Sequence, residues 1–167
     1  MREFIYTARD LIKEAEGFRG IEYLCPAGFR TIGYGRNLET NPLTDDELSR
    51  CFKTQDNKLS VNEKTASDWL TSEIIEIVKQ CEGKEWFEYI GAERKAVVID
   101  LIYNLGLAKW NTFKKCQKGL IDNDFGIASK ELEDSRWFRQ VGLRGKRNVE
   151  IMKFGEKIHD FYKGEGK

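Results

Sequence analysis

The chain has 167 residues, of which 40% are hydrophobic and 34% are charged, and its formal net charge is zero. This length predicts one folding unit, because it can bury one core or two small lobes that share an element, but hardly two independent domains. A net charge of zero gives no overall attraction to polyanions, and the longest apolar stretch, Ala96 to Tyr103, is too short to cross a bilayer. We therefore expect a soluble protein without stable membrane insertion.

The N-terminal segment predicts a helix followed by a hairpin. Apolar residues recur at helical spacing from Phe4 to Ala15, and Gly17 stands where a C-terminal cap would end the helix. Glu16 is therefore expected in the last helical turn. From Ile21 to Arg36 the composition favours extended chain, and Pro26-Ala27-Gly28 supplies the turn between two short strands.

The next segment predicts a loop and then a long helix. Residues 37–57 mix Pro, Asn, Thr and Asp, which indicates loop or weak strand with one helical turn. Ser60-Val61-Asn62-Glu63 has the spacing of a capping box, and apolar residues then recur every three or four positions as far as Cys81. This predicts one amphipathic helix of about 20 residues, roughly 30 Å long, which is enough to bridge two lobes.

The C-terminal half has only helical patterns. The near-continuous apolar run from Ala92 to Leu105 favours a buried helix, because strands usually end within about 4 to 8 residues, and Gly106 would terminate it. Further helical patterns cover residues 111–120, 124–134 and 143–158, with an aromatic turn at Trp137-Phe138.

These elements predict a predominantly helical α+β fold in a single domain, 1–167. Residues 17–59 would form a small α+β lobe with a β-hairpin, and residues 60–82 the connecting helix. Residues 83–167 together with 1–16 would form a larger helical lobe.

The cysteines and the N-terminus indicate the cellular context. Cysteines 25, 51, 81 and 116 are widely spaced and form no C-x-x-C pair, so we expect neither a metal site nor a cofactor. The N-terminus lacks the apolar h-region of a secretory signal, which predicts synthesis in the cytoplasm with four free thiols. A redox-controlled disulfide from Cys25 to one of the other three stays open.

Glu16 is the first candidate for chemistry. Two carboxyl groups in one cleft are the usual apparatus for breaking a glycosidic bond, since one donates a proton to the leaving oxygen and the other supports charge or activates water. At a helix C-terminus, Glu16 faces the negative pole of the macrodipole, which favours the protonated form. Taken alone, without the surrounding motif, a glutamate at this place is more often an ordinary surface residue.

The residues around Glu16 form a longer motif. Glu16-Gly17-Phe18-Arg19 is followed by Tyr23, by Gly28 and by Thr31-Ile32-Gly33-Tyr34-Gly35. This string resembles the phage lysozyme family, glycoside hydrolase family 24. The resemblance implies that Glu16 is the acid, that Cys25 stands at the position of the second carboxylate, that Thr31 holds the attacking water, and that Gly35 contacts the substrate.

The resemblance extends into the C-terminal half. Tyr103-Asn104-Leu105-Gly106 is similar to the family's turn beside the sugar-binding cleft, which makes Asn104 a substrate-binding residue. Ser135-Arg136-Trp137-Phe138 and Arg144-Gly145-Lys146-Arg147 resemble its C-terminal signature. Arg144 would then approach Glu16 as an ion-pair partner, and Arg147 would support the junction between the lobes. Arg36 stands where many relatives carry His, and no role is transferred to it.

Cys25 departs from the family pattern. In the family, the acid protonates the glycosidic oxygen, an oxocarbenium-like transition state develops, and water held by the Thr and the second carboxylate attacks, usually with inversion. Most relatives have Asp at this position, although a subset carries Cys in a similar Cys-Pro-Ala-Gly turn. A free thiol has a pKa of about 8.5, so only a small fraction is thiolate near pH 7. Cys25 would either help to activate water or be an inert packing residue.

The resemblance implies a muramidase that cleaves β-1,4 linkages between N-acetylmuramic acid and N-acetylglucosamine. We expect a monomer that lyses bacterial cells for a phage or prophage, reaching the wall after release by a holin. A catalytically impaired lysozyme-fold module that binds peptidoglycan or a protein is the main alternative. A nucleic-acid binder using the basic segment after Ser135 is a weaker one, because the chain has no recognisable motif and no overall positive charge.

Overall fold

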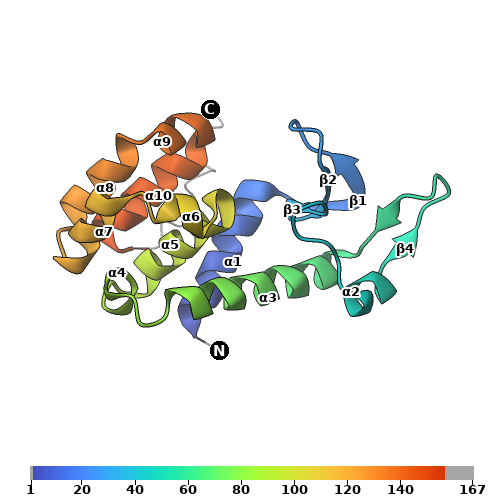
Figure 1. Ribbon diagram of the computed structural model, residues 1–167, viewed down its shortest axis with the longest axis horizontal. Helices are drawn as coiled ribbons and strands as arrows, with labels where there is room; N and C mark the ends of the chain where they lie inside the picture. Colours follow the sequence, from blue (N-terminus) through green and yellow to red (C-terminus); the bar gives the residue numbers. More distant parts are fainter. Residues whose placement is uncertain (1, 157–167) are drawn as a thin grey trace. The chain divides into compact units, whose positions relative to one another are not determined.

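The computed structural model describes residues 2–156, and Figure 1 shows their course. Within these residues the helices are α1 (Glu3–Glu16), α2 (Asp45–Ser49), α3 (Glu63–Cys81), α4 (Glu85–Glu88), α5 (Ala92–Leu105), α6 (Leu107–Trp110), α7 (Lys114–Ile121), α8 (Phe125–Glu133), α9 (Arg136–Val141) and α10 (Leu143–Phe154). The strands are β1 (Arg19–Leu24), β2 (Arg30–Gly33), β3 (Arg36–Asn37), β4 (Phe52–Lys53) and β5 (Leu59–Ser60). The predicted α+β composition, with a mostly helical chain, is confirmed.

The chain divides into two compact units. The first, Ile12–Glu73, is called the sheet unit. The second, called the helical unit, combines Met1–Leu11 with Ile74–Lys167, of which residues 2–11 and 74–156 are described. The divisions fall inside α1 and α3, so both helices contribute residues to both units. The single domain and the lobe boundaries expected from the sequence stay a prediction.

The sheet unit is built on an antiparallel sheet with the strand order β3-β2-β1-β5-β4. The predicted hairpin is present as β1 and β2, which pair Tyr23 with Thr31 and Leu24 with Arg30. Its turn is closed by two bonds, from the Cys25 N–H to the Phe29 carbonyl at 2.9 Å and from the Gly28 N–H to the Cys25 carbonyl at 2.7 Å. Paired residues point to the same face, so Tyr23 and Thr31 lie on one face and Arg30 on the other.

The helical turn expected in residues 37–57 is α2. A capping box begins it, since the Thr44 hydroxyl accepts from the Glu47 N–H and the Glu47 carboxylate accepts from the Thr44 N–H. The expected capping box at Ser60 is wrong. Ser60 belongs to β5 and pairs with Ile21, whereas the Asn62 side chain caps α3 by accepting from the Thr65 N–H at 2.8 Å.

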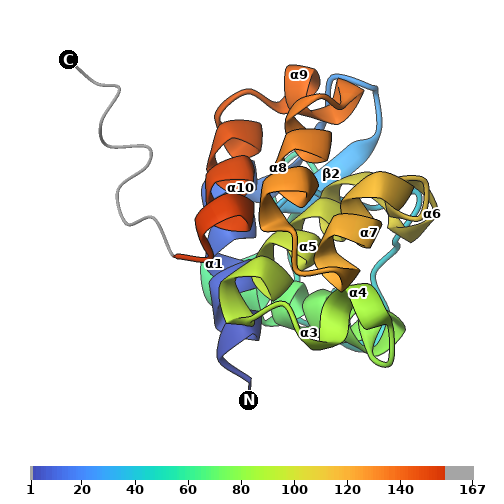
Figure 2. The same ribbon diagram turned by 90° about the vertical axis from the view of Figure 1, so that its left-hand side faces the viewer.

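The helical unit packs around α5, whose residues from Ala96 to Ile102 are all buried. The predicted bounds of this helix match the structure at both ends, and Gly106 follows it with a φ of 83°. Figure 2 shows α7, α8 and α10 next to one another in front of α5. None of the described helices has the length and apolarity that a membrane crossing needs.

Two expectations for the C-terminal half are corrected. Trp137 and Phe138 do not form a turn but lie in α9, because the Ser135 hydroxyl accepts from the Phe138 N–H and begins a helix there. The helix expected over residues 143–158 ends at Phe154, where Gly155 adopts a left-handed conformation with a φ of 72°. The expected end at residue 158 lies outside the described residues.

Candidate active site

Glu16 is the last residue of α1, as the sequence predicts. Gly17 adopts a φ of 68° and donates its N–H to the Lys13 carbonyl at 2.9 Å, which ends the helix. The Glu16 side chain is partly buried, and the backbone of Gly35 lies against its carboxylate. A Cβ added at Gly35 would lie 2.8 Å from Glu16 Oε2 and 3.2 Å from Cδ. Gly35 therefore forms a seat for the carboxylate that no larger residue could provide without displacement.

The turn that carries this seat is anchored through Tyr34. The buried Tyr34 donates its hydroxyl to Glu63 Oε1 at 2.7 Å, at the start of α3. Its ring lies 5.5 Å from the Phe18 ring, and the Lys13 ammonium lies 5.1 Å from its centroid. Lys13 and Phe18 flank Glu16 in the sequence, so the turn and the end of α1 are packed together.

Cys25 lies in the β1–β2 turn and is partly exposed. The pKa of its thiol lies below the usual value, chiefly because the Phe29 amide hydrogen-bonds to the sulfur. Burial is the next largest effect and raises the pKa, while the amides of Ala27 and Gly28 and the Thr31 hydroxyl lower it further. The turn therefore increases the thiolate fraction at neutral pH, through groups whose convergence on the sulfur is not visible in the sequence.

Thr31 is brought next to Cys25 by the same turn. Its buried hydroxyl donates to the Phe29 carbonyl at 3.0 Å, and that carbonyl also accepts from the Cys25 N–H. The Phe29 peptide groups therefore connect both side chains. Arg30 does not assist Cys25, since it lies on the other face and pairs with Glu22 at 2.6 Å.

Asn104, in the helical unit, lies near the C-terminal end of α5. Its side-chain oxygen accepts from the Trp137 indole N–H at 2.9 Å, which orients the amide so that its nitrogen is the end turned away from Trp137. Asn104 is exposed, whereas Trp137 is buried. A substrate-binding role for Asn104 stays a prediction.

Arg144 and Arg147 share one carboxylate, that of the fully buried Asp100. Arg144 donates to both of its oxygens, at 3.1 and 2.8 Å, and Arg147 donates to one at 3.3 Å. Asn148 adds a bond of 2.6 Å, and Arg147 also donates to the Leu11 carbonyl at 3.0 Å. In the sequence, Asp100 shows only as a polar interruption of an apolar run. The expected Arg144–Glu16 ion pair and the support that Arg147 gives to the junction stay predictions.

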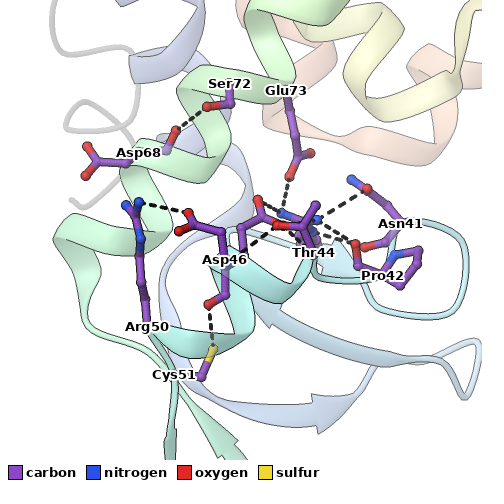
Figure 3. A network of polar contacts seen from close by, with 11 residues as sticks. Asn41, Pro42, Thr44, Asp46, Arg50, Cys51, Asp68, Ser72 and Glu73 are labelled. Carbon is purple, nitrogen blue, oxygen red and sulfur yellow. Dashed lines mark hydrogen bonds and ion pairs between the residues drawn. The ribbon is translucent and has the colours of Figure 1, made fainter.

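Arg36, to which the sequence assigned no role, is a buried cation at the centre of a second charge cluster. Figure 3 shows this polar network and labels Asn41, Pro42 and Glu73 in it. Its guanidinium donates to both Glu47 oxygens at 2.7 and 2.9 Å, and to the carbonyls of Asn41 and Pro42 at 3.0 and 2.8 Å. Glu73 Oε1 lies farther away, 3.5 Å from Nη1. Two carboxyl groups thus compete for one cation. The cluster joins β3, α2, α3 and the loop between β3 and α2.

This competition shifts the pKa values of the two carboxyl groups in opposite directions. Burial raises the pKa of Glu73 to about 7, and the nearby Glu47 carboxylate adds to the effect while Arg36 opposes it. Burial acts in the same direction on Glu47, but its bonds with Arg36 and Thr44 outweigh it and hold the pKa of Glu47 below its usual value. Glu73, which has no short bond to Arg36, is therefore protonated up to near neutral pH.

Comparisons with known proteins agree with the family resemblance. Residues 13–150 match the family profile described as phage lysozyme. The chain is also similar to two Dictyostelium discoideum proteins, probable T4-type lysozyme 1 at 22% identity and probable T4-type lysozyme 2 at 21% identity. Each alignment covers 90% of this chain and 96% of the relative. Because the profile match spans most of the chain and contains every predicted site residue from Glu16 to Arg147, the chain belongs to the phage lysozyme family, with the α+β lysozyme fold.

Proposed function

We propose that this protein is a muramidase, which hydrolyses the β-1,4 linkage between N-acetylmuramic acid and N-acetylglucosamine in peptidoglycan. The observation that carries the proposal is the seat of Glu16. The Glu16 carboxylate stands at the end of α1 and lies against the backbone of Gly35, which has no side chain. This contact holds the proton donor in one place. Glu16 transfers its proton to the glycosidic oxygen as that bond breaks.

Cys25 and Thr31 act on the water. The thiolate of Cys25 takes the place of the usual carboxylate and accepts a proton from the water as its oxygen bonds to the sugar carbon. Thr31, held by the Phe29 carbonyl, orients that water. Asn104 and Gly35 bind the glycan, while Arg144 and Arg147 support the site. No cofactor or metal takes part in this scheme.

The biological role in the proposal is cell lysis for a phage or prophage. The protein would be made in the host cytoplasm, act as a monomer, and reach the cell wall after a holin has opened the membrane. Release of the protein from cells only after holin expression is the expected result, and release without a holin would contradict this route.

The experiment for catalysis compares the wild type with Glu16→Gln on purified Gram-negative peptidoglycan, measuring soluble muropeptides. The expected result is loss of product in Glu16→Gln alone. Glu14→Gln is the matched control, since Glu14 is an exposed carboxylate on the same helix. Equal product from Glu16→Gln and the wild type would contradict the assignment.

The role of Cys25 needs its own substitutions. Cys25→Asp is expected to keep activity, whereas Cys25→Ala is expected to lose most of it. Unchanged product from Cys25→Ala would make Cys25 a packing residue. A wild-type protein that binds peptidoglycan but releases no product would instead be the impaired binding module.

A further inference from the structure

The seat of Glu16 is only as rigid as the turn that forms it. Gly35 lies in the turn between β2 and β3. Its backbone is so close to the Glu16 carboxylate that an added Cβ would be 2.8 Å from Oε2. A shift of the turn toward Glu16 would displace the carboxylate, and a shift away would leave it room to move. What holds the turn in place therefore bears on the proton donor.

Arg36 holds the turn from the residue immediately after Gly35. Its side chain is 7% exposed and extends from β3 to Glu47 in α2, to Glu73 in α3 and to the loop carbonyls at Asn41 and Pro42. Its guanidinium also lies 5.6 Å from the Trp69 ring. These partners come from three other segments of the sheet unit, so the cluster fixes β3 against each of them.

The chemistry of the guanidinium makes this anchor specific. Arginine offers five donors in a planar fork, and the cluster uses this geometry for two bonds to one carboxylate and two to carbonyls. Lysine would keep the charge, but its point-like ammonium cannot reproduce the paired bonds.

We propose that Arg36 is a positioning residue, which acts through Gly35 to hold the Glu16 carboxylate in its productive place. The inference rests on the proposed function, because it assigns Glu16 the role of proton donor. Arg36 itself does not touch the substrate in this scheme. Misplacement of a catalytic group by about 1 Å can cost as much as a hundredfold in rate, so loss of the anchor should lower kcat.

The experiment measures kcat and apparent KM on purified peptidoglycan, together with the carboxyl ¹³C chemical shift of Glu16 in the absence of substrate. For Arg36→Gln we expect kcat to fall by at least about tenfold, with KM within about twofold of the wild type and a displaced Glu16 resonance. For Arg36→Lys we expect a kcat and a Glu16 resonance between those of Arg36→Gln and those of the wild type. Arg50→Gln is the control, because Arg50 ends α2 as an exposed residue paired with Asp46.

Two results would overturn the proposal. One is a wild-type kcat in folded Arg36→Gln, and the other is a Glu16 resonance that moves no more than in Arg50→Gln. Should Arg36→Gln not fold, Arg36→Lys decides by the same two measurements. A wild-type protein without turnover would refute the proposed function, whereas the Glu16 resonance would still decide the positioning role.

The seat itself has a matched pair of variants. Gly35 and Gly83 have nearly the same φ, 78° and 76°, but a Cβ at Gly83 meets nothing within 4 Å. Gly35→Ala and Gly83→Ala therefore share the backbone strain, and only the first displaces Glu16. We expect loss of kcat and a displaced Glu16 resonance in Gly35→Ala alone. The same Glu16 resonance in both variants would refute the seat.

Discussion

The helical unit and the sheet unit each contain a cluster of arginine and carboxylate side chains, but the ratio of the two charges differs. One cluster has fewer carboxylates than arginines, and the other has fewer arginines than carboxylates. In the helical unit, one carboxylate, Asp100, serves two guanidinium groups and accepts four bonds. In the sheet unit, one guanidinium, Arg36, serves two carboxyl groups, and Glu73 receives only a contact of 3.5 Å.

This difference has a physical consequence. A carboxylate bound by several donors is the acceptor that they share, and its removal leaves two buried cations without their partner. A carboxyl group that competes for a cation can take up a proton instead, at little structural cost. The helical cluster therefore fixes structure, whereas the sheet cluster can respond to pH.

The largest effect is expected for Asp100→Asn. The substitution keeps the shape but removes the charge between Arg144 and Arg147, and breaking a buried ion pair in this way costs about 3–5 kcal/mol. Urea unfolding monitored by circular dichroism measures the change in the free energy of unfolding. Asp122→Asn, an exposed residue paired with Lys118, is the control and should cost less than about 1 kcal/mol. Equal costs for the two would remove the distinction between the clusters.

The thiols sharpen the same comparison. Burial raises the pKa of Cys81 and of Cys116, both in the helical unit, to about 12, whereas amide hydrogen bonds lower that of Cys25. The pKa of Cys51, in the sheet unit, is also raised, by burial and by the Glu47 carboxylate. We expect its reactivity to lie between that of Cys25 and that of the two buried thiols. Because the thiolate is the reactive form, Cys25 should be alkylated first, at least about a hundredfold faster than the two buried thiols at pH 7.

Timed alkylation with iodoacetamide, read by mass spectrometry of peptides, measures this order. In urea the four thiols should react at similar rates, which controls for local sequence. Faster labelling of Cys51 than of Cys25 would mean that the turn does not stabilise the thiolate, and would weaken the proposed role of Cys25.

The sequence predicted the parts of the molecule that local signals determine. The bounds of α5 follow from a continuous apolar run and a terminating glycine, and the place of Glu16 follows from the glycine after it. The predicted start of α3 is wrong because Ser60 and Asn62 are both residues that can cap a helix. The choice fell to Asn62 because β5 pairs Ser60 with Ile21, a partner far away in the sequence.

The clusters could not be predicted because their partners are distant in the chain. Asp100 meets Arg144 across 44 positions, and Arg36 meets Glu73 across 37, so neither pairing leaves a periodic pattern. The stabilised thiolate of Cys25 depends on the directions of three backbone amides. The proline and glycine of the turn indicate that the chain bends there, but they do not specify where those amides point.

The smallest effect is expected for Glu73→Gln, and it tests whether the sheet cluster responds to pH. Burial raises the pKa of Glu73 from 4.5 to about 7, so between these values the folded state holds a proton that the unfolded state has lost. Stability conferred by that proton is present below pH 4.5 and is lost as the pH rises through 7. A neutral amide in place of the carboxyl group removes this loss.

We therefore expect Glu73→Gln to match the wild type at pH 4 and to be more stable by about 3 kcal/mol at pH 8. Chemical unfolding at the two pH values measures the divergence. Glu76→Gln, an exposed position on the same helix paired with Lys79, should follow the wild type at both. Parallel curves for Glu73→Gln and the wild type would mean that Arg36 satisfies both carboxylates at once, and the two clusters would then handle charge alike.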